Sequence, residues 1–282
     1  MQVDVVLVSY NQEQYIAQAL ESILMQRVNE DVQVRVVVAD DCSTDRTMEI
    51  IKSFEEKSAF PFVYLPAEEN LGHVRNYQRT FAACDGDYVA ILEGDDYWIN
   101  SLHIQTHVDF LQSHKDCALS TSHPIVFYEE DAIFVPQNRI ELLSEGYKYR
   151  SLREEIILNA FANLSACVIR NDMLRKLDER IYTCSILDWP MYVNLAQYGS
   201  LCLMSGSSNV YRVKKSGEYA GLRKEEQMQR DLLFIAEIEA IFPQYKSHYK
   251  EARKLLRPPG LMEKLVMFAK KVKRICKYVI KC

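Results

Sequence analysis

The chain of 282 residues and 32.8 kDa is long enough to bury a sizeable hydrophobic core without a metal or disulfide staple. Hydrophobic residues make up 48% of it and charged residues 26%, proportions that exclude a wholly disordered or collagen-like chain. The net charge of −5 gives no general basic field, which disfavours a nucleic-acid-binding protein. A soluble enzyme is therefore the expected class.

Apolar, β-branched runs alternate with helical spacing through residues 1–100. Short buried strands are expected at 3–8, 32–39, 62–65 and 88–92. Helices are expected between them, at 13–27, from Ser43 or Thr44 to about residue 54, and at 72–84. This alternation predicts the α/β class, with a mainly parallel, doubly wound central sheet.

From about residue 117 the periodicity becomes mixed. Strand-like segments are expected near 118–128, 162–169 and 201–213, and helices near 170–178 and 187–198. The second half should therefore be α+β in character. Arg257-Pro258-Pro259-Gly260 should break the chain before a basic tail, because proline cannot continue a helix.

Three of the expected strands end in polar clusters, which are Ser9-Tyr10-Asn11, Asp40-Asp41 and Glu93-Gly94-Asp95-Asp96. Open parallel sheets bind ligands beyond the carboxyl ends of their strands, so the clusters should converge on one crevice. Carboxylates there could accept hydrogen bonds from a base or ribose, or hold a divalent cation. The alternative is structural, with one cluster capping a helix and the acidic 93–96 cluster forming a solvated turn.

These clusters belong to four longer segments, LVSYNQEQYIAQALESILMQ, VVADDCSTDRTMEII, ENLGHVRN and YVAILEGDDYW. In this order they resemble the motifs of the family 2 glycosyltransferases, which are inverting enzymes with the GT-A fold. Two later segments extend the resemblance to about residue 220. ILDWPM at 186–191 is similar to the acidic motif that supplies the catalytic base, and VYRV at 210–213, followed by Gly217, is similar to the strand and loop that fold over the diphosphate.

Carried over position by position, the resemblance implies two sets of binding residues. Those that would bind the nucleotide sugar are Ser9, Tyr10, Asn11, Asp40, Asp41, Asn70, Gly72, Arg75 and Asp95. Those that would hold Mn²⁺ or Mg²⁺, the cation that stabilises the departing diphosphate, are Glu93, Asp95 and Asp96.

The sequence departs from the family pattern at two places. Glu93 stands where an Asp is common, although a glutamate can still coordinate a metal. Lys214-Lys215 lies in a region where some relatives place a metal-binding His, and a lysine there could contact phosphate directly.

Asp188 matches the family's catalytic base. The resemblance implies a single displacement in which this carboxylate deprotonates the acceptor hydroxyl while the metal-bound diphosphate leaves. An N-cap of a helix at Trp189–Gln197 is an alternative role, compatible with the first. Trp98 or Trp189 could stack on a sugar, but large aromatics beside a cleft more often belong to the core or wall.

The resemblance implies a metal-dependent, hexosyltransferase-type enzyme, with UDP the commonest donor nucleotide of the family. The acceptor would be a hydroxyl of a glycan or lipid-linked molecule in bacterial-type surface polysaccharide assembly. One alternative, a sugar nucleotidyltransferase, should carry a Gly-rich loop that Ser9-Tyr10-Asn11-Gln12 does not provide. The other, a non-catalytic sugar-nucleotide-binding or scaffold protein, should lack the base or the metal ligands, whereas Asp188, Asp95 and Asp96 are present.

Residues 1–220 are expected to form the GT-A domain, with a nucleotide-binding half at 1–100 and an acceptor-binding half at 101–220. A helical extension at 221–257 and a basic tail at 258–282 would follow. The tail carries a hydrophobic stripe of Leu261, Leu265, Phe268, Val272, Ile275 and Val279 among lysines and arginines. This pattern predicts a C-terminal amphipathic helix that lies on an anionic membrane, or that packs on its own domain or in a homodimer.

The strand-like run Val3–Val8 leaves no room for a signal peptide, and charges interrupt every long apolar run. We therefore expect a cytoplasmic protein, peripheral on the inner face of the membrane. The eight cysteines contain no CxxC pair and predict neither a zinc site nor a disulfide framework. His103 and His107 have the i,i+4 spacing of a metal pair but lack a nearby carboxylate pattern, which favours an ordinary helix surface.

Overall fold

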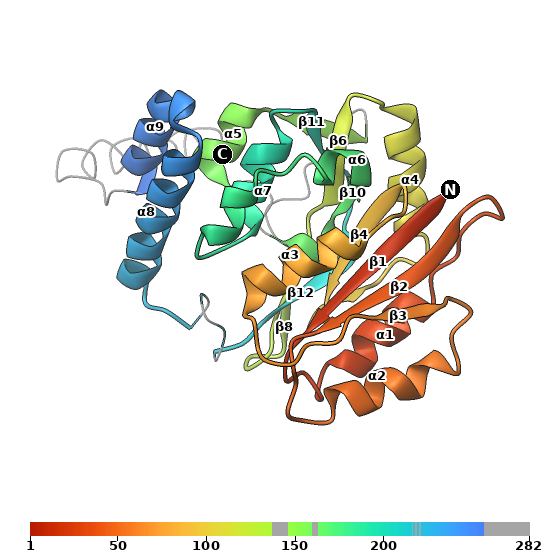
Figure 1. The fold of residues 1–282 in the computed structure, drawn as a ribbon. Helices are drawn as coiled ribbons and strands as arrows, with labels where there is room; N and C mark the ends of the chain where they lie inside the picture. The colour runs from red at the N-terminus through yellow and green to blue at the C-terminus, as the bar shows by residue number, and fades with distance from the viewer. Residues whose placement is uncertain (137–145, 160–162, 216, 218, 220, 257–282) are drawn as a thin grey trace, which may run out of the picture.

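The computed structural model describes residues 1–136, 146–159, 163–215, 217, 219 and 221–256 (Figure 1). Within these residues eight strands form the main sheet, in the order β3-β2-β1-β4-β10-β6-β11-β9. In chain order these strands are β1 (Gln2–Ser9), β2 (Gln33–Asp40), β3 (Phe62–Tyr64), β4 (Tyr88–Glu93), β6 (Cys117–Ser122), β9 (Tyr147–Arg150), β10 (Val168–Arg170) and β11 (Ser200–Met204).

The first four strands of the main sheet are parallel. Strand β1 pairs with β2 on one side and β4 on the other, and β2 pairs with β3. Successive side chains of β1 enter opposite faces, with Val3, Val5 and Leu7 in one hydrophobic cluster and Val6 and Val8 in the other. Burial on both faces explains the continuous apolar run of this strand and confirms the predicted doubly wound α/β architecture.

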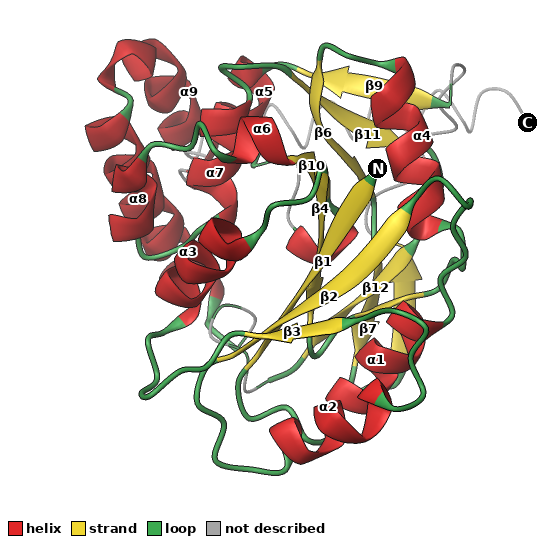
Figure 2. Ribbon diagram, turned by 45° about the vertical axis from the view of Figure 1, so that its right-hand side comes forward, coloured by secondary structure: helices red, strands yellow, loops and turns green. Residues whose placement is uncertain are grey.

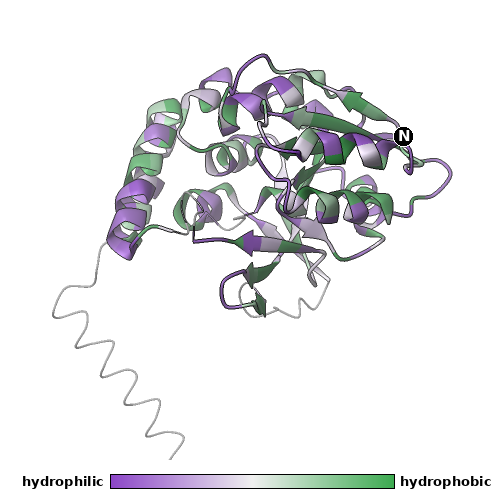
Figure 3. Cartoon of the chain, turned by 90° about the horizontal axis from the view of Figure 1, so that it is seen from below, coloured by the Kyte–Doolittle hydropathy of each residue, from purple (hydrophilic) through white to green (hydrophobic). Residues whose placement is uncertain are grey.

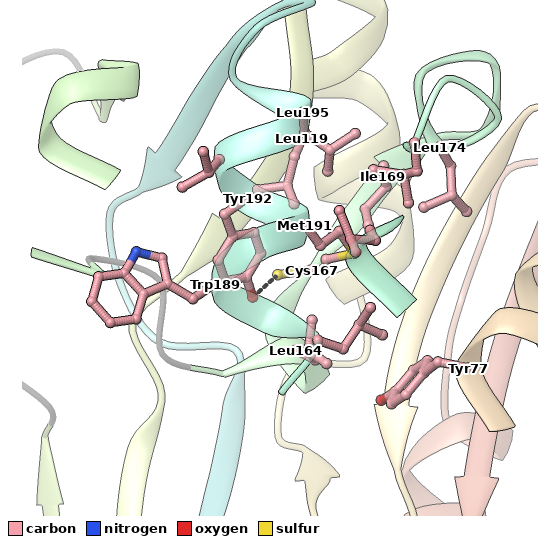
Figure 4. Packing of buried hydrophobic residues seen from close by; sticks show 14 of the residues in the cluster. Tyr77, Leu119, Leu164, Cys167, Ile169, Leu174, Trp189, Met191, Tyr192 and Leu195 are labelled. Carbon is pink, nitrogen blue, oxygen red and sulfur yellow. Dashed lines mark hydrogen bonds between the residues drawn. The ribbon is translucent and has the colours of Figure 1, made fainter. Parts of the chain in front are cut away.

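Helices cover both faces of the sheet (Figure 2). The helices whose apolar side chains join the cluster around Val5 are α1 (Ile16–Leu24), α2 (Thr47–Glu55) and α4 (His103–Ser113). The helices that join the cluster around Val6 are α3 (His73–Ala83), α5 (Leu152–Leu158), α6 (Asn171–Leu174), α7 (Asp188–Leu195), α8 (Lys224–Ile241) and α9 (Lys246–Leu256). Figure 4 shows the second cluster, where Tyr192, Leu195 and Met191 pack beside Leu119 and Ile169.

The second half of the chain is mixed, in agreement with its predicted α+β character. Strand β10 runs antiparallel to both β4 and β6, whereas β11 runs parallel to β6. The expected strand at 118–128 is divided into β6 and β7, and the one at 201–213 into β11 and β12, which belong to different sheets. Gly206, at φ 88°, lies in the turn between β11 and β12, where a left-handed backbone favours glycine.

A second, smaller sheet lies at the end of β4. It joins β5 (Tyr97–Trp98), β12 (Asn209–Val213), β7 (Ile125–Tyr128) and β8 (Ile133–Pro136) in that order. Since β12 pairs with β5, which follows the acidic cluster directly, this sheet brings residues 209–213 against residues 93–96.

The structure corrects the prediction for the two histidines of α4. His103 is 0% exposed and His107 is 2% exposed, so neither lies on the helix surface. Their Nδ1 atoms lie 2.9 Å from Ser208 Oγ and 2.7 Å from Ser120 Oγ, respectively. Burial lowers the pKa of both rings, that of His107 to about 4, so both are compatible with the core as neutral groups.

A disulfide joins Cys117 on β6 to Cys202 on the adjacent strand β11, contrary to the expectation of no such bond. The two cysteines are 85 residues apart, and only the pairing of these strands brings them together.

The helical extension packs on the main domain. Phe234, Ile235 and Ile238 of α8, and Tyr249 and Ala252 of α9, are buried in the same cluster as Val6 of the central strand. Figure 3 shows polar and hydrophobic residues alternating along these helices at one side of the molecule. The hydrophobic core therefore continues past residue 220.

No helix in the described parts of the chain combines the length and the hydropathy needed to cross a membrane. The predicted amphipathic helix at 258–282 lies outside the described residues.

Candidate active site

A cleft of about 520 Å³ lies where β1 and β4 end, between α3, α7 and the end of β12. The predicted site residues that line it are Ser9, Tyr10, Asp41, Asn70, Gly72, Glu93, Asp95 and Asp188. They come from five separate parts of the sequence. Because β2, β1 and β4 are parallel neighbours, the residues that follow these three strands meet at one edge of the sheet. Asn11, Asp40, Arg75 and Asp96 do not line the cleft.

Asp40 is occupied by contacts that shape the end of β2. Its Oδ1 accepts the hydroxyl of Ser9 at 2.9 Å and that of Ser43 at 2.5 Å, and its Oδ2 accepts the Ser43 N–H at 2.8 Å. Asn11 supports the same turn, because its Oδ1 accepts the Thr44 N–H at 2.8 Å. Asp40 lines a neighbouring pocket of about 450 Å³ instead of the cleft.

Asp41 holds the loop that precedes α3. Its two carboxylate oxygens accept the N–H groups of Leu71 at 2.9 Å and Gly72 at 2.8 Å. Gly72 has φ 82°, a left-handed conformation in which a Cβ would be strained. Asn70 Oδ1 accepts the same Gly72 N–H at 3.1 Å.

Arg75 and Arg79 lie one turn apart on α3 and differ in environment. Arg75, the residue singled out from the sequence, is exposed. Arg79 donates from Nη2 to the Asp40 carbonyl at 2.8 Å and from Nη1 to the Leu65 carbonyl at 2.9 Å. Arg79 therefore ties the ends of β2 and β3 together, a role that the sequence pattern did not reveal.

Gly94 allows the acidic cluster to approach the first loop closely. A Cβ at this position would lie 2.3 Å from Gln12 Oε1 and 2.7 Å from the Ile16 side chain. A larger residue would therefore push the end of β4 away from the start of α1.

Glu93 is a cleft carboxylate with a strongly raised pKa. Burial, followed by the charges of Asp95 and Asp188, raises its pKa to about 8. The hydroxyl of Tyr77 donates to its Oε1 over 3.3 Å, and His73 Nδ1 lies 4.0 Å from the same oxygen. At neutral pH Glu93 thus carries a proton in much of the population unless a cation joins the site.

Asp95 and Asp96 are adjacent in sequence but face different surroundings. Asp95 lines the cleft, and its Oδ2 accepts Lys214 Nζ at 2.7 Å. Asp96 is 2% exposed, and its Oδ2 accepts the Asn163 amide at 3.0 Å and the Ser165 hydroxyl at 2.6 Å. Its Oδ1 accepts the Arg212 N–H at 2.9 Å, so Asp96 ties the end of β4 to β12.

Asp188 is the first residue of α7 and lines the same cleft as Glu93 and Asp95. Its Oδ1 accepts the N–H of Trp189 at 2.8 Å, but the N-cap position of α7 belongs to Leu187, so Asp188 is not the N-cap considered from the sequence. Burial raises the pKa of this carboxyl, and the nearby His73 opposes the rise. A raised pKa brings a carboxylate closer to the range in which it accepts a proton efficiently.

Neither tryptophan lines the cleft. Trp98 Nε1 donates to the Ser165 carbonyl at 2.7 Å, and Trp189 Nε1 donates to the Glu155 carbonyl at 2.8 Å. Both indoles are buried, and Figure 4 shows Trp189 among the core residues. The aromatic side chains that do line the cleft are Tyr10, Tyr211 and Tyr219.

The basic residues at the end of β12 were only partly anticipated. Arg212 donates from Nε to the Asp95 carbonyl at 3.0 Å and lies over the ring of Tyr15, 4.7 Å from its centroid. Lys214 lies 4.6 Å from the same centroid. The alternation in Tyr211-Arg212-Val213-Lys214 could have indicated this pair of cations, because it places Arg212 and Lys214 on the same side of an extended chain.

A divalent cation fits the cleft only with help from a ligand. In the described part of the chain, no group of three or more His, Cys, Asp or Glu residues is arranged to hold a metal. Glu93 and Asp95 nevertheless both line the cleft, and the charge of Asp95 raises the pKa of Glu93, which shows that the two carboxylates interact. They can supply part of an oxygen coordination sphere, which Mg²⁺ and Mn²⁺ commonly complete with phosphate and water.

The family model described as glycosyl transferase family 2 matches residues 4–178. An uncharacterized protein of Mycobacterium tuberculosis is 30% identical over 214 residues, which cover 74% of this chain and 58% of the relative. The chain therefore spans less than two thirds of the length of that relative.

Two solved structures have a similar fold. Staphylococcus aureus TarS in complex with UDP-GlcNAc gives a TM-score of 0.63 at 22% identity, covering 85% of this chain and 67% of that one. The mannosyltransferase PcManGT from Pyrobaculum calidifontis, in complex with GDP-Man and Mn²⁺, gives 0.65 at 18% identity, covering 90% and 69%. These likenesses confirm the predicted GT-A type of fold. Because the family model covers more than half of the sequence, the chain belongs to glycosyl transferase family 2.

Proposed function

We propose that this chain is an inverting glycosyltransferase that moves a sugar from a nucleotide-sugar donor to a hydroxyl of a glycan or lipid-linked acceptor. The observation that carries the proposal is the cleft itself, which Asp188 lines together with the Asp95–Lys214 ion pair. A base and a cationic group thus share one space. This is the arrangement that a displacement with an anionic leaving group requires.

Asp188 is the proposed general base. Its buried carboxyl has a raised pKa, and it is fixed at the start of α7 by the Trp189 N–H. An acceptor hydroxyl bound beside it would lose its proton to Asp188 as the oxygen attacks the sugar. Attack from the side opposite the diphosphate inverts the anomeric centre.

The end of β12 and the acidic cluster form the proposed leaving-group site. Lys214 places a positive charge in the cleft, and Arg212, which also lines the cleft, donates to the Asp95 carbonyl. A Mn²⁺ or Mg²⁺ ion held by Glu93 and Asp95 would supply further charge stabilisation of the diphosphate. We assign the metal to these two residues and not to Asp96, because both oxygens of Asp96 accept protein donors.

The nucleotide would bind along Ser9, Tyr10, Asp41 and the Asn70–Gly72 loop, which line the cleft from the β1 and α3 side. In this proposal Asn11 and Asp40 shape that surface through the turn that follows β2. Arg75 is exposed on α3, and in this proposal it would contact the phosphates only once the donor is bound. A UDP-sugar is the first candidate donor, since the TarS structure contains UDP-GlcNAc, and a GDP-sugar is the second, since PcManGT contains GDP-Man.

The acceptor is proposed from the relatives and from the sequence of the tail. TarS is named a poly(ribitol-phosphate) β-N-acetylglucosaminyltransferase, which supports a surface polymer as the class of acceptor. The basic residues of 261–282 support a peripheral location at the inner face of an anionic membrane. A homodimer through the same segment remains the alternative, and light scattering with and without residues 261–282 would distinguish them.

Calorimetric titration of UDP-, GDP- and dTDP-sugars, with Mn²⁺ or Mg²⁺ and with EDTA, tests the proposal. We expect one donor to bind in a metal-dependent manner to the wild type and to Asp188→Asn, but weakly to Asp95→Ala. Asp188→Asn should lose about 10³-fold in transfer rate, the typical worth of a general base. Glu225→Ala, an exposed residue of α8, is the control and should behave as wild type. Absence of binding by every donor would contradict the proposal.

A further inference from the structure

We propose that the ammonium of Lys214 and the divalent cation are mutually exclusive partners of Asp95. Lys214 occupies the cation position in the free protein and is released to the diphosphate when the donor binds with its metal. The inference rests on the proposed function and concerns the order in which charges fill that site.

The Asp95–Lys214 pair is the physical basis. The Lys214 Nζ lies 2.7 Å from Asp95 Oδ2, and the two side chains retain only 20% and 23% exposure. The ammonium also lies over the ring of Tyr15, at 4.6 Å from its centroid. A carboxylate and a ring face thus hold one positive charge within the cleft.

The position of Lys214 follows from the pairing of β12 and is not a chance surface contact. Lys214 comes directly after β12, whose last residue, Val213, accepts the Glu129 N–H through its carbonyl at 3.1 Å. Arg212 fixes the strand to both aspartates, since its N–H donates to Asp96 and its Nε to the Asp95 carbonyl. The backbone on both sides of the ion pair is therefore held before any ligand enters.

The two cations exclude one another because they need the same negative charge. A divalent ion bound to Asp95 would lie within a few ångströms of the ammonium, where like charges repel strongly. The charge of Lys214 already extends to Glu93, where it opposes the rise in pKa caused by burial and by Asp95. A metal that enters without nucleotide must therefore displace Lys214 from a satisfied contact.

A donor diphosphate removes this obstacle. Its oxygens offer the ammonium a new anionic partner in the same cleft, since a lysine pairs readily with phosphate as a point charge. The metal then gains Asp95 while Lys214 keeps a partner. Metal and nucleotide should consequently bind with positive coupling, and by linkage each should raise the affinity of the other equally.

Measurement of Mn²⁺ affinity by electron paramagnetic resonance, with and without UDP, tests this exchange. Without nucleotide we expect Lys214→Gln to bind Mn²⁺ about tenfold more tightly than wild type, because no ammonium competes for Asp95. Lys214→Arg retains the charge and should stay close to wild type. Lys224→Gln, an exposed lysine of α8, is the matched control. Thermal unfolding of each variant checks that the fold is retained.

The second expected result concerns UDP. In wild type, Mn²⁺ should strengthen UDP binding more than in Lys214→Gln, by about the same tenfold factor, and in EDTA the variant should bind UDP more weakly. An unchanged Mn²⁺ affinity in nucleotide-free Lys214→Gln would overturn the exchange, while metal-dependent UDP binding by wild type would leave the proposed function standing. Failure of both proteins to bind Mn²⁺ would also overturn it. Failure of wild type to bind any nucleotide sugar would count against the function itself.

Discussion

The two acidic strand ends on either side of β1 look alike in sequence but differ in how the protein uses their oxygens. At the end of β2, Asp40 accepts donors from Ser9 and Ser43, and Asp41 accepts two backbone N–H groups of the loop before α3. At the end of β4, Asp95 faces the cleft with a lysine as its partner, and Glu93 has a strongly raised pKa. The carboxylates at the end of β2 therefore shape the surrounding loops, whereas Glu93 and Asp95 at the end of β4 are placed to interact with a ligand in the cleft.

The same difference in hydrogen bonding separates Asp95 from Asp96 at the end of β4. Asp96 resembles Asp40 and Asp41, since three protein donors occupy it, whereas Asp95 has its ion pair inside the cleft. A run of acidic residues therefore does not act as one metal site. Each carboxylate must be assigned from its donors, because a group that the fold already satisfies binds a cation only by giving up those bonds.

Asp96→Ala should produce the largest loss of stability among these carboxylates. The substitution leaves donors from Asn163, Ser165 and Arg212 without their acceptor, at a total cost of about 3 kcal/mol in the free energy of unfolding. Urea unfolding measures the change. A variant as stable as wild type would show that the Asp96 carboxylate does not stabilise the fold. Asp96 would then no longer differ from Asp95 in its structural role.

Asp95→Ala should affect binding instead of folding. We expect about 50-fold weaker donor binding in the presence of Mn²⁺, because the variant loses a metal ligand, with a change in unfolding free energy below about 1 kcal/mol, typical of a partly exposed ion pair. Calorimetry and urea unfolding on the same preparation test both parts. A large loss of stability would place Asp95 with the structural carboxylates.

Glu93→Gln should change how stability depends on pH. The folded state keeps a proton on Glu93 up to about pH 8, whereas the unfolded chain loses it near the ordinary pKa of 4.5. The folded state binds more protons in that interval, so this group makes the free energy of unfolding fall as pH rises from about 4.5 to about 8 and leaves it level above.

The glutamine variant should lack this contribution and become more stable than wild type at pH 8, by at least about 2 kcal/mol, with little difference at pH 4.5. Metal-free urea unfolding at a series of pH values provides the measurement. Parallel pH profiles for the two proteins would mean that Glu93 is ionised at neutral pH and would weaken the contrast between the strand ends.

Asp41→Ala should give the smallest effect. It removes the acceptor of the Leu71 and Gly72 N–H groups, which then meet water at the cleft edge, so we expect a loss of about 1 kcal/mol in stability. Donor binding should weaken several-fold with or without metal, since the loop and not the cation is changed. Weakening only in the presence of Mn²⁺ would instead assign Asp41 to the metal end of the cleft.

Much of the first half could be predicted from sequence because local pattern and topology agree there. Continuous apolar runs predicted β1, β2 and β4, and the rule that ligands bind beyond the ends of parallel strands predicted where Ser9, Asp41 and Asp95 would meet. The sugar-stacking role considered for Trp98 and Trp189 finds no support in their placement, because both are buried core residues. The surface assignment of His103 and His107 was wrong, since both rings are buried and the Nδ1 atom of each lies within hydrogen-bonding distance of a serine hydroxyl.

The sequence by itself determined the α/β class, the positions of the acidic clusters and the family resemblance, because these depend on short-range periodicity and on motifs within single segments. Only the tertiary structure decided which carboxylates are already satisfied, that β12 carries Lys214 to Asp95 across 119 residues, and that Cys117 and Cys202 meet. The physical reason is that hydrogen-bond donors and ion-pair partners are supplied by segments far apart in the chain. A local sequence pattern therefore cannot predict which of these distant groups will pair.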